Sequence, residues 1–375
     1  MSEAGVIFGG PSPEHDVSVL TGLQAARAMA SAVGSGGASA GVRAVYWART
    51  GDFFEVDPTL EAPAFATGVP RGAVPLRLVA SNGGGWFAKG GVLGKERRVE
   101  LEAVVNCCHG GPGEDGTLQA ALDLAGVAYT GPSAAGAALG MDKAAFGAVV
   151  AGAGMDCLPR TVLALDGPGP GFGGPYIVKP RYGGSSIGIE VVADLATARA
   201  RLGANPHLRQ GAVIEPYRPD LVDIQVAIRS WPALECSAIE RPLRSAAATE
   251  ILTYSDKYVG GEGMASAPRE LPAKLSAGMA GAVLEAARAV AGLAGLRGVA
   301  RLDFLAGEGE CYVNELNTIP GSLARYLWVE PPIGFAALLG DLIAEATARP
   351  TTCWTTAGAD GSALRAAGTI ASKLG

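Results

Sequence analysis

The stretch VARLDFLAGEGECYVNELN, residues 299–317, carries the strongest constellation of polar residues in this chain. Two apolar runs, 299–305 and 311–316, flank the turn sequence GEGE at 307–310, and this pattern predicts an antiparallel hairpin. Side chains alternate between the faces of a strand, so Arg301 and Asp303 share one face, and so do Glu315 and Asn317. Two carboxylates and an amide that converge from paired strands form an all-oxygen site suited to Mg²⁺. The alternative is a pair of solvent-facing carboxylates in a salt bridge with Arg301.

A glycine-rich loop lies upstream of this hairpin, in the sequence VKPRYGGSSIG at 178–188. It connects the apolar run 176–179 to the run 189–192, so a strand–loop–strand hairpin is expected that covers a ligand. Glycines let the backbone approach a ligand closely, and consecutive N–H groups with a hydroxyl form a concavity that binds anions. Lys179, at the end of the first strand, would supply a positive charge to a phosphate. A flexible hairpin turn is the alternative.

Other candidates lie in two loops and beside two lysines. Lys143 follows Met-Asp at the start of a helix, and Lys257 lies in YSDKY at 254–258. The loops are GGPSPEHDVS at 9–18 and HGGPGEDG at 109–116, each of which follows a short apolar strand. Taken singly, each is typical of solvated or hydrogen-bonded loop residues. Together they indicate an enzyme that binds a nucleoside triphosphate with lysines and a glycine lid, a metal with an acidic hairpin, and an acceptor in a separate domain.

Length and composition set the frame for these sites. A chain of 375 residues predicts two or three domains, and 49% hydrophobic against 18% charged residues excludes a disordered chain. The net charge of −6 gives no basic field, so nucleic acid is not expected as a partner. The longest apolar stretch, 275–296, has the steps of three and four of an amphipathic surface helix, so no membrane span is expected. Six cysteines without CxxC spacing suit reduced thiols, and a cytoplasmic location is expected.

The order of the expected elements points to three α/β blocks. The first third alternates short apolar strands and helices, which predicts an open α/β sheet whose ligands lie beyond the carboxyl ends of its strands. From about residue 131 the pattern changes to the block that carries the glycine-rich loop. The last block carries the helix 275–296, the acidic hairpin and a further helix near 335–348.

These motifs and their order resemble the D-alanine–D-alanine ligase family of the ATP-grasp superfamily. The resemblance covers residues 5–330 and rests on eight segments in the order of the family: GGPSPEHDVS (9–18), HGGPGEDGTLQ (109–119), YTG (129–131), MDK (141–143), VKPRYGGSSIG (178–188), DKY (256–258), RLDF (301–304) and NELNTIPG (314–321).

The resemblance implies a fold and a reaction. The fold would be an N-terminal α/β substrate domain (1–135), a central ATP-grasp lid domain (136–222), a C-terminal domain with an antiparallel sheet that binds ATP and magnesium (223–350), and a tail (351–375). ATP would phosphorylate the carboxylate of a first D-alanine, and the amine of a second would attack the acyl phosphate, as in the synthesis of peptidoglycan precursors. Two Mg²⁺ ions, with Mn²⁺ as a substitute, and a homodimer are further expectations.

The resemblance also implies a role for each matching residue. Nucleotide binding would fall to Lys143, Lys179, Ser186, Glu215, Asp223 and Lys257, and the Mg²⁺ ligands would be Asp303, Glu315 and Asn317. Glu14, fixed by hydrogen bonds to Ser185 and Tyr258, would hold the ammonium of the first substrate. Arg301 and the N–H of Gly321 would stabilise the oxyanion. His109 would lie near the acceptor. One additional residue between Glu215 and Asp223 weakens the assignment of Asp223 to the ribose.

One departure from the family lies after Gly321. The family usually has, five residues beyond this glycine, a Ser that binds the carboxylate of the acceptor, and here Tyr326 stands at that place with Arg325 before it. A Tyr fills more volume than a Ser, so the pocket would hold a different or differently oriented acceptor, with Arg325 as a replacement for the carboxylate clamp. Unchanged specificity after lineage drift is the alternative.

Two further functions stay open on the sequence alone. One is a related ligase with another acceptor: D-serine, D-lactate, or an amino acid or peptide of a secondary pathway. The other is an inactive nucleotide-binding regulatory protein, against which the retained lysines and acidic residues argue, because a silent site has no need of carboxylates that repel one another.

Overall fold

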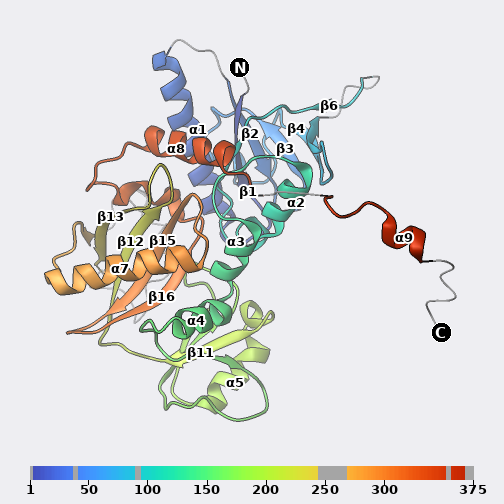
Figure 1. Ribbon diagram of the computed structural model, residues 1–375. Helices are drawn as coiled ribbons and strands as arrows, with labels where there is room; N and C mark the ends of the chain where they lie inside the picture. Colours follow the sequence, from blue (N-terminus) through green and yellow to red (C-terminus); the bar gives the residue numbers. More distant parts are fainter. Residues whose placement is uncertain (1–2, 37–40, 89–93, 244–267, 352–355, 368–375) are drawn as a thin grey trace.

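The computed structural model describes residues 3–36, 41–88, 94–243, 268–351 and 356–367. Its strands form three sheets, of seven, four and five strands (Figure 1). Apart from Val222, each sheet draws its strands from one of the three segments expected from the sequence. The predicted boundaries themselves stay predictions.

The seven-stranded sheet has the order β6-β5-β4-β3-β2-β1-β7. Its middle is parallel, with β1 (Ala4–Gly9) between β2 (Val42–Trp47) and β7 (Val104–Asn106). Its other side is antiparallel and continues through β3 (Phe53–Val56), β4 (Val74–Val79), β5 (Gly85–Ala88) and β6 (Arg97–Arg98). The two loops that the sequence singled out follow β1 and β7 at the carboxyl ends of parallel neighbours, so they meet at one edge of the sheet.

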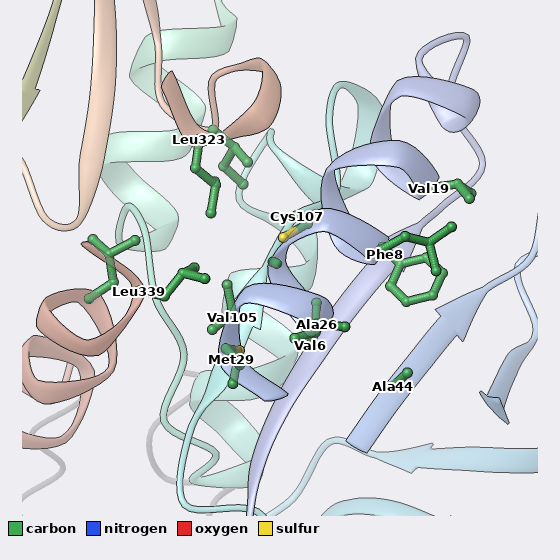
Figure 2. Packing of buried hydrophobic residues seen from close by; sticks show 14 of the residues in the cluster. Val6, Phe8, Val19, Ala26, Met29, Ala44, Val105, Cys107, Leu323 and Leu339 are labelled. Atoms are coloured by element: carbon green, nitrogen blue, oxygen red, sulfur yellow. The ribbon is translucent and has the colours of Figure 1, made fainter. Parts of the chain in front are cut away.

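One hydrophobic core joins this first sheet to the end of the chain. Helix α1 (His15–Gly36) packs on β1, and its neighbours are η4 (Gly321–Leu327) and α8 (Phe335–Ala348). Figure 2 shows Leu323 of η4 and Leu339 of α8 in the same cluster as Val105 and Cys107, which are fully buried. The core therefore fixes the segment 321–348 against the loops that follow β1 and β7.

The four-stranded sheet has the order β10-β9-β11-β8 and is antiparallel throughout. Its strands are β8 (Thr161–Leu163), β9 (Tyr176–Pro180), β10 (Glu190–Val192) and β11 (Ala212–Pro216). The glycine-rich loop connects β9 to β10, as predicted. Helix α5 (Leu195–Ala204) and the 3₁₀ turn η3 (Pro206–Leu208) pack on this sheet. Before it in the chain come the 3₁₀ turns η1 (Ala62–Phe65) and η2 (Gly111–Gly113) and the helices α2 (Thr117–Ala125), α3 (Ala134–Met141) and α4 (Lys143–Gly152).

The five-stranded sheet has the order β14-β13-β12-β15-β16. These strands are β12 (Val222–Arg229), β13 (Glu235–Pro242), β14 (Arg269–Glu270), β15 (Val299–Ala306) and β16 (Cys311–Asn317). The predicted hairpin is confirmed, because β15 and β16 pair antiparallel. The predicted amphipathic helix is α7 (Ala277–Leu293), whose Val283 and Val290 pack with Leu302 and Leu316 beneath the sheet.

The remaining described elements add little to the site. A short helix, α9 (Ser362–Ala366), has no buried residue. Among the described residues no helix combines the length and the apolar character that a membrane crossing needs. The five cysteines in this part of the chain are free, and Cys107 and Cys108 are buried.

Candidate active site

Four polar side chains form a row across the five-stranded sheet. Asp303 lies opposite Glu315 on β16 and opposite Gln225 on β12, and Gln225 lies opposite Glu240 on β13. Residues directly opposite one another on neighbouring strands point to the same face of the sheet. Helix α7 covers the other face, where Leu302 is fully buried. This polar row (Glu315, Asp303, Gln225 and Glu240) therefore faces away from the core.

Asp303 is held by two neighbours on its own face of the hairpin. Arg301 donates to its carboxylate from Nε at 2.6 Å and from Nη2 at 2.7 Å. Asn317 donates from Nδ2 to Oδ2 at 3.2 Å. The prediction that Arg301 and Asp303 share a face is confirmed. Because the guanidinium contacts both oxygens, the orientation of the carboxylate is fixed.

The three predicted magnesium ligands, Asp303, Glu315 and Asn317, occupy adjoining positions on β15 and β16. In the described ranges no three His, Cys, Asp or Glu side chains gather closely enough to hold a metal ion by themselves. Two carboxylates with an amide oxygen nevertheless fit Mg²⁺, which commonly binds through one or two carboxylates together with the phosphates of a substrate. The donor set therefore suits a divalent cation that shares its coordination with a phosphate-bearing ligand.

Lys143 is the first residue of α4, and its side chain lies between the glycine-rich loop and the polar row. Its Nζ donates to the carbonyl oxygen of Gly183 at 2.6 Å and lies 3.5 Å from Oε2 of Glu315. Asp142 caps the helix by accepting two backbone N–H groups of its first turn, and it forms an ion pair with Arg181 at 2.6 Å. The capped helix start and the loop thus hold this ammonium group against the acidic hairpin.

Lys179 is fixed by a buried carboxylate rather than by solvent. Its Nζ donates to Oε2 of Glu215 at 2.8 Å and to Oδ1 of Asn314 at 3.2 Å. Burial by itself would raise the pKa of the Glu215 carboxyl, but Lys179 and Arg160 outweigh it, so the pKa is lowered and the carboxylate stays charged. The lysine ammonium of β9 therefore has a charged counter-ion on the neighbouring strand β11.

Arg160 is a residue of this site that sequence reasoning missed. Its Nε donates to Oε1 of Glu215 at 2.5 Å, and its two terminal nitrogens donate to the carbonyl oxygens of Lys143 at 2.6 Å and Asn314 at 2.9 Å. These partners lie 55, 17 and 154 residues away along the chain, so the local sequence carries no signal of the role. One guanidinium joins α4, β11 and β16.

The glycine-rich loop contacts the loop that follows β1. Ser185 donates from Oγ to Oε1 of Glu14, which is the predicted pair. Ser185 and Ser186 have φ of 52° and 59°, in the left-handed region that few L-residues adopt. A Cβ on the neighbouring Gly184 would lie 3.0 Å from Oε2 of Glu14, so only glycine permits the approach without displacement. The third member of the predicted trio, Tyr258, and the predicted Lys257 lie outside the described residues.

The segment before Gly321 is fastened to the loops of the first sheet. Glu114 accepts the N–H of Ile319 at 2.9 Å and that of Gly110 at 2.8 Å. His109 lies with Nδ1 2.7 Å from the carbonyl oxygen of Ile319 and with Nε2 2.8 Å from the hydroxyl of Thr21.

This geometry assigns the hydrogen bonds around His109. A carbonyl oxygen only accepts, so Nδ1 donates to Ile319 and the neutral ring accepts from Thr21 at Nε2. The hydroxyl of Thr21 in turn accepts the N–H of Ser322 at 3.1 Å. Both sides of Gly321 are therefore held by this network.

The two buried groups of this network predict a measurable pH effect on stability. Burial, with Glu14 nearby, raises the pKa of Glu114 from 4.5 to about 8. The fold retains a proton that the unfolded chain releases, so the free energy of unfolding falls as pH rises from 4.5 to 8. Burial lowers the pKa of His109 from 6.5 to about 4. Its contribution to the free energy of unfolding therefore rises as pH increases from 4 to 6.5. Of these two groups, only Glu114 changes the stability between pH 6.5 and 8.

We expect Glu114→Gln to flatten the pH dependence of stability between pH 6.5 and 8, by at most about 1.4 kcal/mol per pH unit. The measurement is urea unfolding at pH 6.5, 7.25 and 8, with the exposed Glu61→Gln as the control that keeps the slope of the unsubstituted chain. An unchanged slope in Glu114→Gln would contradict the assignment.

Two cavities adjoin at the polar row. Both are lined by Lys143, Gly183, Gly184, Gln225 and Glu315. Of the other predicted site residues, the first cavity is lined by Glu14, His109, Ser185, Arg301, Asn317 and Gly321. The second cavity is lined by Lys179, Ser186, Glu215, Asp223 and Asp303. The fold thus brings together all the predicted site residues that it describes, apart from two.

Those two are Arg325 and Tyr326, which are not among the residues that line the first cavity. They lie on η4, directly after three residues (322–324) with φ near 50°. The chain turns at these residues, and the two side chains that follow lie outside the cavity lining. The guanidinium of Arg325 lies 5.5 Å from the ring centre of Phe335, and Tyr326 packs against the first core. The ring of Tyr326 instead lies under another cation, Arg269, at 4.9 Å.

Comparisons with known proteins agree with this site. A family model described as D-ala D-ala ligase N-terminus matches residues 3–132, and one described as D-ala D-ala ligase C-terminus matches residues 170–344. The D-alanine–D-alanine ligase of Methylobacterium sp. (strain 4-46) is 33% identical over 371 residues, which are 92% of this chain and 91% of that protein. This chain belongs to the D-alanine–D-alanine ligase family. The ligase of Bradyrhizobium sp. (strain ORS 278) is 28% identical over 362 residues, 92% of this chain and 95% of that relative.

Solved structures confirm the ATP-grasp fold that the resemblance implied for this family member. The D-alanine–D-alanine ligase from Coxiella burnetii has a TM-score of 0.73 at 20% identity, over 93% of this chain and 95% of that one. The VanG D-Ala:D-Ser ligase from Enterococcus faecalis has a TM-score of 0.70 at 22% identity, over 92% of this chain and 99% of that one.

Proposed function

We propose that this chain joins two D-amino acids at the expense of ATP, with D-alanine as the donor and D-alanine as the first acceptor to test. One oxygen of the donor carboxylate attacks the γ-phosphorus of ATP and ADP leaves. The amine of the acceptor then attacks the acyl phosphate, loses a proton and expels inorganic phosphate. The product would be a dipeptide for peptidoglycan precursors.

The observation that carries the proposal is the pair of cavities that adjoin at Lys143 and Glu315. Phosphoryl transfer asks a protein mainly for positioning and for neutralisation of charge. The second cavity offers Lys179 with its fixed counter-ion and the loop hydroxyl of Ser186, and the first offers Glu14 for an ammonium group. A nucleotide in one cavity would therefore meet an amino acid in the other.

In the second cavity we assign the triphosphate to Lys143 and Lys179. Glu215 lines this cavity and is 1% exposed, and its carboxylate would accept a hydrogen bond from the base while it retains Lys179. Asp223 lines the same cavity and would contact the ribose. The apolar walls Ile177, Ile189 and Leu305 suit a flat purine.

At the junction of the cavities, Asp303, Glu315 and the amide oxygen of Asn317 would hold a divalent cation together with the phosphates. Bound there, the cation supplies charge neutralisation and Lewis acidity to the phosphate that is transferred. The chain's own part is to orient these oxygens: Arg301 holds both oxygens of Asp303, and Lys143 lies beside Glu315. Two Mg²⁺ ions are the number that we propose.

In the first cavity we assign the donor ammonium to Glu14, which Ser185 holds. Arg301 and the N–H of Gly321 would face the oxyanion that develops when the acceptor attacks. Thr21, His109 and Glu114 do not touch the reacting atoms in this proposal. They position the segment around Gly321, so that its N–H keeps one direction.

An inactive nucleotide-binding protein is not supported, because the chain retains the paired carboxylates and both lysines of the cavities. The deciding experiment incubates the purified chain with ATP, Mg²⁺ and D-alanine, measures ADP, and identifies the product by mass. One dipeptide per ADP is expected. ATP binding without ADP release for any D- or L-amino acid would overturn the proposal.

Arg160 gives a prediction within this function. We expect Arg160→Met to raise KM for ATP about tenfold or more and to lower stability, because Glu215 would retain one cation only. KM for D-alanine should stay within a factor of about two, and Arg160→Lys should recover part of the loss. The matched control is Arg199→Met, which loses bonds to two backbone carbonyls on the surface of the same region. Equal KM for ATP in Arg160→Met and the unsubstituted chain would contradict the role.

We propose in addition a homodimer, a cytoplasmic location and the domain boundaries at residues 135, 222 and 350. The family membership supports them as expectations. Light scattering on the eluted protein tests the dimer, since a monomer mass at micromolar concentration would refute it.

A further inference from the structure

One wall of the first cavity was not foreseen from the motifs. It is formed at the edge of the five-stranded sheet by Glu240 and Pro242 of β13, Leu243, Pro268 and Arg269 of β14. Among these residues Arg269 brings the only positive charge. The wall therefore adds a cation at the side of the cavity formed by β13 and β14, which lie at the opposite edge of the sheet from β16.

Arg269 is held in one place by two contacts of different kinds. Its Nη1 lies 2.9 Å from Oε1 of Glu240, and both side chains are largely buried, at 13% and 4% exposure. The guanidinium also lies over the ring of Tyr326, 4.9 Å from its centre. An ion pair with a cation–π contact behind it orients a guanidinium and lowers the entropy lost when it binds a ligand.

The other positively charged side chains that line this cavity in the described part of the chain are Lys143 and Arg301, and both lie at the reacting end. Lys143 contacts Gly183 and lies beside Glu315. Arg301 donates two hydrogen bonds to Asp303. His109 is a neutral donor to Ile319 in the network described above. A carboxylate that enters the cavity away from the phosphates would therefore meet its counter-charge at Arg269.

The spacing along the polar row is wide enough to separate the reacting end of the cavity from Arg269. Glu240 lies two strands from Asp303, and neighbouring strands are about 4.8 Å apart, so the separation of their backbones is about 10 Å. The reacting carbonyl must lie near Arg301 and the transferred phosphate. The acceptor approaches with its amine toward that carbon, so its carboxylate trails on the other side, toward β13 and β14.

We infer that Arg269 binds the carboxylate of the acceptor amino acid, with Glu240 and Tyr326 as its positioning residues. The inference rests on the proposed function. It moves the carboxylate clamp from Arg325, the sequence-based candidate, to a residue that lines the cavity. It also gives Tyr326 a role: the aromatic ring serves as a platform for the guanidinium rather than as a direct ligand of the substrate.

The test is a competition between two acceptors in one reaction. D-alanine and D-alaninamide, which lacks the carboxylate, are mixed at equal concentration with ATP and Mg²⁺, and the ratio of D-alanyl-D-alanine to D-alanyl-D-alaninamide is measured by mass. This ratio does not depend on how much of a variant is folded or active. The unsubstituted chain should favour D-alanine strongly.

We expect Arg269→Gln to lower this ratio about 10- to 100-fold, as the loss of one charged hydrogen-bonding partner predicts. KM for ATP should not change. Arg269→Lys, which keeps the charge without the fork, should fall between the two, and Tyr326→Leu should shift the ratio in the same direction by less. Arg27→Gln, an exposed position on α1, is the matched control and should keep the ratio.

Three results would overturn the inference while the proposed function stands. They are an unchanged ratio in Arg269→Gln, a collapse of the ratio in Arg325→Gln instead, and no preference for D-alanine in the unsubstituted chain. If the unsubstituted chain forms ADP but no dipeptide with any D-amino acid, the proposed function itself fails and the inference fails with it.

Discussion

Asp303→Asn should lower kcat about 1000-fold. The substitution removes one of two carboxylates that face the junction of the cavities and breaks the paired hydrogen bonds from Arg301. Charge neutralisation by a divalent cation contributes several kcal/mol to such a transition state, and each 1.4 kcal/mol is a factor of ten in rate. The Mg²⁺ concentration at half-maximal rate should rise as well, because the remaining carboxylate binds the ion more weakly.

The measurement is ADP release at a series of Mg²⁺ concentrations. Asp341→Asn is the matched control, because it removes an Arg–Asp ion pair, to Arg229 at 2.6 Å, outside both cavities. The control should stay within a factor of about two. A rate within tenfold of the unsubstituted chain in Asp303→Asn, with the same Mg²⁺ dependence, would show that the carboxylate does not serve the reaction.

Lys143→Met should lower kcat/KM for ATP by a factor of about 100 to 1000, the usual cost of losing one buried donor to developing negative charge. Lys143 is 7% exposed and lines both cavities, and its Nζ lies 3.5 Å from Oε2 of Glu315. Its removal leaves that carboxylate without the nearby cation, so repulsion of the triphosphate adds to the lost attraction.

Steady-state kinetics and calorimetric binding of ADP measure this effect, with the exposed Lys274→Met as control. Circular dichroism and a thermal melt establish that the variant is folded. If folded Lys143→Met binds ADP and turns over as the unsubstituted chain does, the ammonium has no part in phosphate binding.

The hairpin could be predicted because its signals are local. Alternation alone places Arg301 with Asp303 on one face and Leu302 in the core, and the structure agrees on both. The loops after β1 and β7 were likewise predictable, since each follows a short apolar run. The roles of the residues in these loops came from the resemblance to the family, because a loop taken singly does not reveal its function.

The parts that escaped prediction depend on long-range contacts. Arg160 joins partners up to 154 residues away, and Arg269 gains its place from a strand pairing and a distant ring. The position of the family's Ser, five residues beyond Gly321, suggested Tyr326 and the preceding Arg325 as cavity residues. Three residues with left-handed backbone, none of them glycine, turn the chain there, and no residue type announces that turn.

In the proposed reaction the donor carboxylate itself attacks ATP. The most direct test uses D-alanine labelled with ¹⁸O in its carboxylate, unlabelled ATP and Mg²⁺, and measures the inorganic phosphate released by mass. If an acyl phosphate forms and the amine expels it, each phosphate carries one oxygen from the donor, so one ¹⁸O per phosphate is predicted. Phosphate without label, released while dipeptide accumulates, would contradict the account.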